Sequence, residues 1–120
     1  MMRGDLAWTV ETRGDVRLVA PAGRVDEASA TAFAERLTQE IEGAAAEGSR
    51  RLAIDLAAIE YMSSRGLRGL TLAQRQSGES GITIVLVRPN EIMREILAIS
   101  RYDKVFQVFD SVERIGTAQA

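Results

Sequence analysis

Short apolar stretches and amphipathic stretches alternate along this chain of 120 residues. Two strand-like stretches come first, at residues 6–12 and 16–22. The Arg-Gly-Asp turn at residues 13–15 joins them, which predicts a β-hairpin. Pro21 falls near the expected end of the second strand, where its missing N–H group is tolerated.

From Ala28 the apolar residues recur at the spacing of a helix. Four of them predict its core face: Ala30, Phe33, Leu37 and Ile41. The polar residues between them are assigned to the solvent face: Glu35, Arg36, Gln39 and Glu40. The candidates for its cap and first turn are Asp26, Glu27 and Ser29, and the glycines that mark its expected end are Gly43 and Gly48.

Two further strands and a helix follow the same alternation. A strand is predicted over residues 52–56 and ends in a short turn. The next helix begins at Ser63 and Ser64 and runs to about Ser77, with Gly78 as its C-terminal cap. Residues 82–87 form a nearly continuous β-branched run, which is typical of a strand buried on both faces.

The last third of the chain predicts a helix, a strand and a helix. The helix, over residues 89–100, has one apolar face made of Ile92, Met93, Ile96 and Leu97. A short strand follows at residues 104–109. Asp110 or Ser111 then opens a terminal helix over residues 110–118.

The predicted order of elements is therefore ββαβαβαβα. Such alternation favours a central mixed sheet, in which an N-terminal hairpin precedes mostly parallel strands packed with α-helices. A chain of this length forms one compact domain, so we expect a single α/β domain over residues 1–120 with a core from about residue 6 to 118. Leu67, Leu70 and Ile96 are assigned to its core, and Trp8 to packing.

Composition narrows the classes of function. The formal net charge of −2 argues against a nucleic-acid or membrane partner. The chain has no Cys and no His, which removes the thiol nucleophile, the commonest general base and the commonest metal ligand. We therefore expect neither an enzyme nor a bound metal. No apolar run approaches the roughly 20 residues of a membrane span, and Asp5 interrupts any signal-peptide core, so the expected location is cytoplasmic.

Three catalytic or ligand-binding classes fit the sequence poorly. A receiver-type domain needs an acidic cluster with a nearby Lys, but Asp26 and Glu60 follow strands without a third acid, and Lys104 lies in the last loop. Arg-Gly-Leu-Arg-Gly-Leu at residues 65–70 lacks the glycine spacing of a dinucleotide-binding turn. A serine hydrolase would have only Lys104 as an amine base.

The serine pair has two interpretations. Ser63 and Ser64 stand where a helix cap is expected, and a serine there satisfies free N–H groups of the first turn. A phosphate at the same place would be stabilised by the helix dipole and by free amides, with Arg65 and Arg68 close by in sequence. Gly66 and Gly69, which have no Cβ, allow this helix to approach the sheet closely.

Three segments, spread in order over residues 6–118, resemble one family. They are "RVDEASATAF", "AIDLAAIEYMSSRGLRGL" and "ILAISRYDKVFQVFDSVERI". They resemble the STAS domain, and more closely its small bacterial members, the anti-sigma factor antagonists. The most specific parts are Asp55 with Leu56 and the serine turn before Gly66, and residues 23–26 (Gly-x-hydrophobic-Asp) support them.

The resemblance implies a STAS-like fold and a protein-binding switch without a cofactor. In this family the antagonist binds an anti-sigma factor that is also a serine kinase of the histidine-kinase-like ATPase type, which frees a sigma factor. The kinase phosphorylates a serine at the start of a helix and the complex separates. A serine phosphatase of the PP2C type then resets the cycle.

Alignment on Gly66 and Leu67 places the implied phospho-acceptor at Ser64, with Ser63 as the second choice. The implied partner-binding residues are Asp26, Ser63, Ser64, Arg65 and Arg68. For Asp26, a role as a helix N-terminal acid stays equally open. The sequence departs from the family at three positions: Ser63 replaces an Asp common before the acceptor, Arg65 replaces a small residue, and Arg101 replaces a frequent Gly.

Two other functions fit the same resemblance. One is a STAS module that binds partners constitutively in a signalling assembly, with Ser64 never phosphorylated. The other is a STAS domain that senses a nucleotide or a small ligand. An added phosphate mass on Ser64 separates the first from the switch, and ligand-induced stabilisation tests the second.

Overall fold

A computed structural model describes residues 6–117, so residues 1–5 and 118–120 of the predicted domain and terminal helix lie outside the described part. The elements, in chain order, are β1 (Ala7–Arg13), β2 (Val16–Val25), α1 (Ala30–Glu47), β3 (Arg51–Asp55), β4 (Ile59–Met62), α2 (Ser64–Glu79), β5 (Thr83–Val87), α3 (Glu91–Ser100), a 3-10 turn η1 (Tyr102–Lys104), β6 (Gln107–Phe109) and α4 (Glu113–Thr117).

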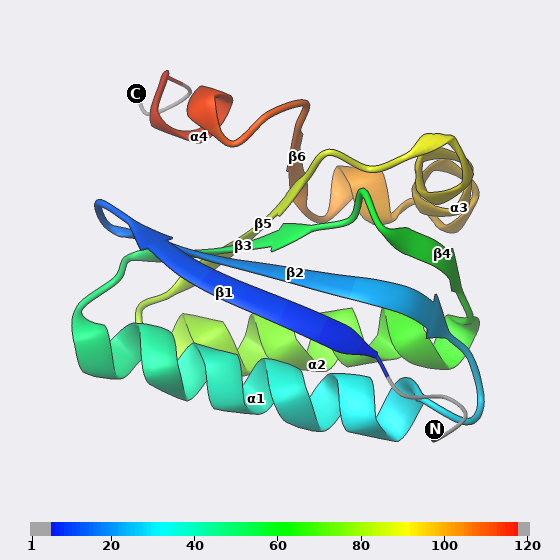
Figure 1. Cartoon of the computed structure of the whole chain (residues 1–120), viewed down its shortest axis with the longest axis horizontal. Helices are drawn as coiled ribbons and strands as arrows, with labels where there is room; N and C mark the ends of the chain where they lie inside the picture. Colours follow the sequence, from blue (N-terminus) through cyan, green and yellow to red (C-terminus); the bar gives the residue numbers. More distant parts are fainter. Residues whose placement is uncertain (1–5, 118–120) are drawn as a thin grey trace.

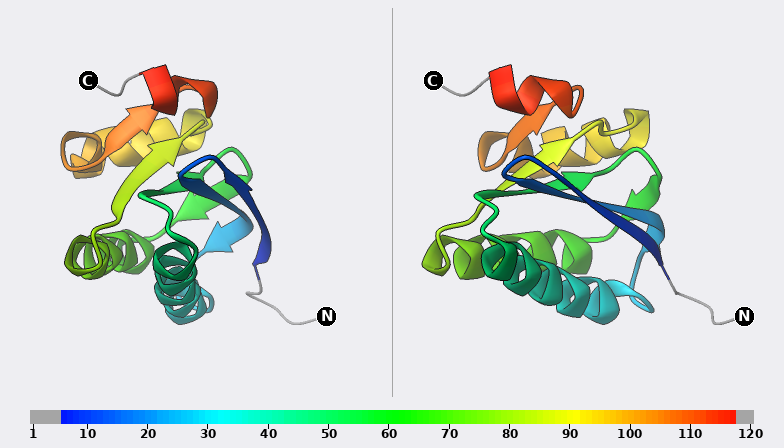
Figure 2. Two further views of the ribbon diagram at one scale, coloured as in Figure 1. Left: turned by 90° about the vertical axis from the view of Figure 1, so that its left-hand side faces the viewer. Right: turned by 60° about the vertical axis from the view of Figure 1, so that its left-hand side comes forward.

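The strands form one mixed sheet in the order β1-β2-β3-β5-β6, with β4 paired to the far end of β2. The β1–β2 pair is antiparallel and every other pair is parallel. Gly14 turns the hairpin with a φ of +60°. Helices α1 and α2 lie side by side on one face of the sheet, and α4 lies on the opposite side (Figures 1 and 2). The predicted α/β class and mixed sheet are confirmed.

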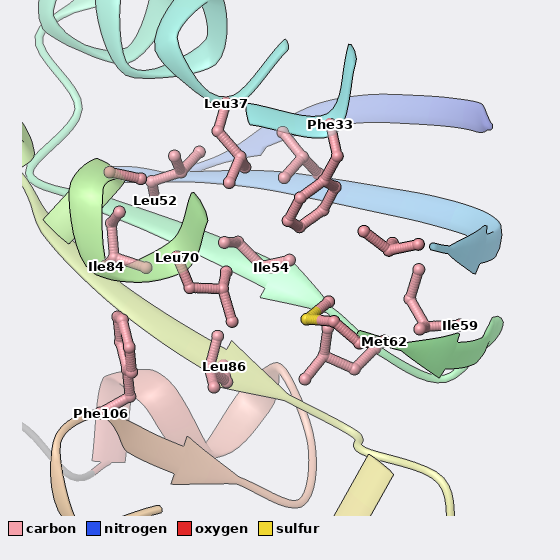
Figure 3. Packing of buried hydrophobic residues seen from close by; sticks show 14 of the residues in the cluster. Phe33, Leu37, Leu52, Ile54, Ile59, Met62, Leu70, Ile84, Leu86 and Phe106 are labelled. Carbon is pink, nitrogen blue, oxygen red and sulfur yellow. The ribbon is translucent and has the colours of Figure 1, made fainter. Parts of the chain in front are cut away.

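The main core lies between the sheet and α1 and α2 (Figure 3). Phe33 and Leu37 of α1 and Leu70 of α2 are fully buried there against side chains of β3 and β5. A smaller cluster on the other face joins Val85 to Ile115 of α4. The strand β5 is thus buried on both faces, and the predicted burial of Leu70 and Val85 is confirmed.

Trp8 stacks on Phe33 with ring centroids 5.8 Å apart, as expected for a packing residue. Ile96 is only half-buried, and Ile92, placed on the apolar face of its helix by the sequence pattern, is 49% exposed. Met93 and Leu97 are the buried residues of α3, and the half-buried Ile96 packs against the edge of the same core. Within residues 6–117, no helix combines the length and the apolar character that crossing a bilayer requires.

The sequence pattern missed β4, which was expected to be a turn. Its two central residues, Glu60 and Tyr61, are exposed, so its four residues show no alternation of apolar and polar positions. Long-range pairing with β2 makes it a strand. For the same reason β2 extends beyond residue 22 to Val25. The register shifts after Gly23, whose φ of +128° suits glycine, and Pro21 lies between the parts of β2 that pair with β3 and with β4.

Helix α1 differs from its prediction in its polar residues. Glu40, assigned to the solvent face, is buried and accepts hydrogen bonds from Arg17 at 2.9 Å and Arg36 at 2.7 Å. Gly43 was expected to end the helix but lies inside it. A Cβ there would be 2.8 Å from Nη2 of Arg17, so this glycine makes room for the guanidinium. Gly48 caps the helix as predicted.

Other boundaries shift by a few residues. Helix α2 continues past Gly78 to Glu79, and Ser80 is its C-cap, so the predicted Gly78 cap is wrong. The 3-10 turn takes up residues 102–104, which shortens the last strand to Gln107–Phe109. Asp110 and Ser111 precede α4 rather than open it, because that helix begins at Glu113.

Asn90 ties α3 to the turn that leads into β4. Its Oδ1 accepts the N–H of Met93 at 2.9 Å and caps the helix. Its Nδ2 donates to the carbonyl oxygens of Leu56, Ala57 and Ile59, the last at 2.7 Å. One side chain therefore fixes both the start of α3 and the path of the chain between β3 and β4.

We expect Asn90→Ala to lower the free energy of unfolding by about 2 kcal/mol, since it removes a helix cap and the donor to the turn. Asn90→Ser keeps a capping oxygen but cannot reach the three carbonyls, so its loss should be about 1 kcal/mol. Urea denaturation of the two variants and the wild type measures the contributions of the helix cap and of the hydrogen bonds to the turn. Equal stability of Asn90→Ser and wild type would show that the ties to the turn contribute nothing.

Candidate functional site

The serine turn lies where β2 and β4 end. These strands run parallel with Val25 opposite Met62, and the N–H of Ser63 donates to the carbonyl oxygen of Val25 at 2.8 Å. Asp26 is the next residue after Val25. The carboxyl ends of two neighbouring strands thus bring Asp26 and the start of α2 to the same end of the sheet.

The two serines have different environments. Ser63 is 8% exposed and is the extended N-cap of α2, and its Oγ accepts the N–H of Gly66 at 3.3 Å. Ser64 is the first helical residue and is exposed. Within residues 6–117 its hydroxyl makes no hydrogen bond. Ser63 therefore performs the capping role, and the Ser64 hydroxyl is left available for another reaction.

Gly66 holds the start of α2 against the sheet. A Cβ at this position would lie 2.6 Å from Cγ1 of Val25 and 2.7 Å from Cγ of Met62, distances that real side chains do not reach. Gly69 instead faces α1, where a Cβ would lie 3.5 Å from the Cβ of Ala34, an ordinary contact. The expectation that both glycines bring the helix close to the sheet is therefore correct only for Gly66.

Asp26 mainly shapes its own loop. Its Oδ1 accepts the N–H of Ala28 at 3.1 Å, and its own N–H donates to Oγ of Ser29 at 3.0 Å. The Oγ of Ser29 also donates to the carbonyl oxygen of Arg24 at 2.6 Å. No hydrogen bond joins Asp26 to Ser63 or Ser64 among the described residues. The structure brings Asp26 to the serine end without direct contact.

Arg65 and Arg68 both border a shallow groove of about 270 Å³ between α1 and α2, whose floor includes Ala30, Ala34, Gly69 and Leu72. The Nη1 of Arg65 lies 3.0 Å from Oε1 of Glu27, and both side chains are more than half exposed, so this pair adds little stability. Arg68 is exposed and has no ion pair within residues 6–117. We call Asp26, Ser63, Ser64, Arg65 and Arg68 the serine surface.

Asp55, part of the Asp-Leu motif, is a structural residue in this fold. Its carboxylate is buried and accepts two hydrogen bonds from Arg88, at 2.8 and 3.1 Å, as well as the N–H of Ala57. These hydrogen bonds raise the pKa of Arg88 above its ordinary value. Arg88, which has a φ of +52°, follows β5, so its ion pair with Asp55 joins the ends of β3 and β5.

The acidic residues do not gather at one point. Within residues 6–117, no group of three or more Asp or Glu side chains is placed to hold a metal ion. Asp26 follows β2, but Glu60 lies inside β4 rather than after a strand as expected, and Lys104 lies in the 3-10 turn after α3. Sequence reasoning missed Arg88 and Asn90, since their partners are more than 30 residues away along the chain.

Comparison with known proteins places this geometry in a family. The STAS domain model matches residues 7–115. BtrV of Bordetella bronchiseptica, named as an anti-sigma factor antagonist, is 33% identical over 88 residues, which cover 73% of this chain and 76% of that protein.

Solved structures of two other proteins resemble the fold. The crystal structure of an anti-sigma factor antagonist from Mycobacterium paratuberculosis is 27% identical and has a TM-score of 0.73, covering 98% of this chain and 96% of that one. SpoIIAA of Bacillus is 15% identical and shares the fold alone. Its unphosphorylated form has a TM-score of 0.63 with coverage of 94% and 96%, and its phosphorylated form 0.62 with 94% and 100%.

We expect Gly66→Ala to lower the free energy of unfolding by about 2 kcal/mol, because the added methyl group overlaps Val25 and Met62. Gly69→Ala is the matched control, since it gains the same helix propensity of up to about 1 kcal/mol without the overlap. Chemical denaturation of both variants isolates the contact. Equal effects at the two positions would contradict a close approach at Gly66.

Proposed function

Because the chain belongs to the STAS domain family, and within it to the anti-sigma factor antagonists, we propose that it is a phosphorylation-switched binding module. In its unmodified form it binds an anti-sigma factor that is a serine kinase of the histidine-kinase-like ATPase type. This binding releases a sigma factor. Phosphorylation of Ser64 ends the complex, and a PP2C-type phosphatase restores the unmodified form.

The observation that carries this proposal is the difference between the two serines. A kinase needs a hydroxyl that it can reach and that the fold does not use. The Ser64 hydroxyl is exposed and makes no hydrogen bond within residues 6–117, while Ser63 is buried and caps the helix. Modification of Ser63 would place a phosphate on a buried hydroxyl that already accepts the N–H of Gly66, whereas modification of Ser64 leaves that contact in place.

A phosphate on Ser64 should not destabilise the fold. The first turn of α2 contains no acidic residue, so the positive end of the helix dipole meets no other negative charge from the helix itself. A phosphate of charge about −2 is favourable in such a position. The similarity of the fold to both forms of SpoIIAA agrees with a STAS fold that carries this group.

The same phosphate would strongly weaken the binding of a partner that docks on the serine surface. The serine surface lies at one end of the sheet, where the Ser64, Arg65 and Arg68 side chains are exposed. Covering it would remove water from a double negative charge, which costs several kcal/mol unless the partner supplies cations. Phosphorylation of Ser64 should therefore change the stability of the fold little and lower the affinity for the partner strongly.

We expect Ser64→Asp to weaken binding of the kinase partner by at least tenfold and to change the free energy of unfolding by less than about 1 kcal/mol. Ser64→Ala should bind persistently and resist release by ATP. Capture of the partner from the native cell, followed by affinity and melting measurements, gives both values. Since Asp carries less charge than phosphate, protein phosphorylated at Ser64 is the stronger form of the test. Unchanged affinity of that form would refute the switch.

We expect incubation with the captured kinase and ATP to add the mass of one phosphate to the wild type and to Ser63→Ala, but not to Ser64→Ala. Intact-mass spectrometry reads this directly. Ser63→Ala is the matched control, because it removes a hydroxyl from the adjacent residue and keeps Ser64. A phosphate that persists in Ser64→Ala and disappears in Ser63→Ala would move the acceptor by one residue. No phosphate on any form would favour a constitutive binding module.

A further inference from the structure

Arg68 stands one helical turn after Ser64 on α2. Residues four apart on a helix lie on the same face, with Cβ atoms about 5–6 Å apart. Both side chains are exposed, and within residues 6–117 neither makes a hydrogen bond or an ion pair. A guanidinium group without a partner therefore lies within reach of the hydroxyl that we propose as the phospho-acceptor.

The direction of the helix favours contact between these two residues. Side chains on a helix lean toward its N-terminus, so the long side chain of Arg68 can reach back over the turn that carries Ser64. An anion that precedes a cation by four residues is the better arrangement for a helical ion pair. A guanidinium also binds a phosphate with two parallel hydrogen bonds.

The neighbouring charges leave this role to Arg68. Arg65 is already held by Glu27, at 3.0 Å. Arg24 lies 3.8 Å from Asp26 and over the ring of Tyr61. The remaining charged residue of the groove is Glu35 on α1, which repels a phosphate. Asp26, Glu27 and Glu35 add negative charge at this end of the molecule, so a cation beside the phosphate would add to the favourable effect of the helix dipole.

We propose that Arg68 is a positioning residue that holds the phosphate of phosphorylated Ser64 on this protein's own helix. Phosphorylation would then change the serine surface in two ways, by adding negative charge and by occupying the free guanidinium beside the groove between α1 and α2. This inference rests on the proposed function only for the choice of Ser64 as the modified residue.

The test places phosphoserine at position 64 during translation, with a genetically encoded phosphoserine, so that no kinase is required. Phosphorus-31 NMR then follows the second ionisation of the phosphate, whose ordinary pKa is about 6. A nearby cation stabilises the dianion and lowers this pKa. Arg68→Gln should therefore raise it by about 0.3 units or more relative to the wild type at low salt, and salt near 0.5 M should reduce the difference.

Arg75→Gln is the matched control. Arg75 is on the same helix, is exposed and lies about 16 Å further along its axis than Ser64, so its removal should leave the pKa unchanged. Equal shifts for Arg68→Gln and Arg75→Gln would reduce the effect to net charge and overturn the proposal. A larger shift for Arg65→Gln would assign the role to Arg65 and overturn it too. Neither result depends on a kinase, so failure here is separate from failure of the proposed switch.

Discussion

The parallel pairing between the ends of β2 and β4 is the contact on which the serine surface depends. It places the backbone of Ser63 against Val25 and so starts α2 at the end of the sheet, next to Asp26. Gly66 completes this contact, because only a residue without a Cβ lets the first turn rest on Val25 and Met62. With a larger residue in place of Gly66, α2 would start farther from the sheet, and the hydrogen bond from the Ser63 N–H to the Val25 carbonyl oxygen would be lost.

The capping role and the proposed phosphorylation site fall on two different serines, Ser63 and Ser64. A lone serine at a helix start would have to serve both as cap and as modification site, so one hydroxyl would carry both roles. Here the Oγ of the buried Ser63 accepts the N–H of Gly66, and within residues 6–117 the Ser64 hydroxyl makes no hydrogen bond. Ser63 stands where the family resemblance leads us to expect an Asp, and it fits this arrangement because both residues are good N-caps. A neutral cap also leaves the first turn of α2 free of acidic side chains beside Ser64.

The sequence predicted the features that depend on local pattern. The buried strand β5, the core face of α1 and the hairpin follow from periodicity and turn residues, and the structure confirms them. Features that depend on distant partners were missed. Glu40 was assigned to the solvent face from its helical position, but it is buried against Arg17 of β2. The segment of β4 has no strand pattern of its own and is a strand because it pairs with β2.

The departure at Arg101 falls on an unusual backbone conformation. Arg101 has a φ of +68°, the left-handed conformation in which glycine is least strained, which agrees with the glycine that the family resemblance leads us to expect at this position.

In the proposed switch, the position of Ser64 on α2 decides what kind of signal a phosphate can give. At the C-terminus of a helix, a phosphate would oppose the dipole and loosen the last turn, so the signal would be a change of shape. At the first residue of α2 it suits the dipole, and the fold beneath it is fixed by Ser63 and Gly66. The phosphate then changes the charge of a rigid surface. A partner that reads this surface needs no rearrangement of the antagonist, and the difference in binding comes entirely from groups that both proteins present at the interface.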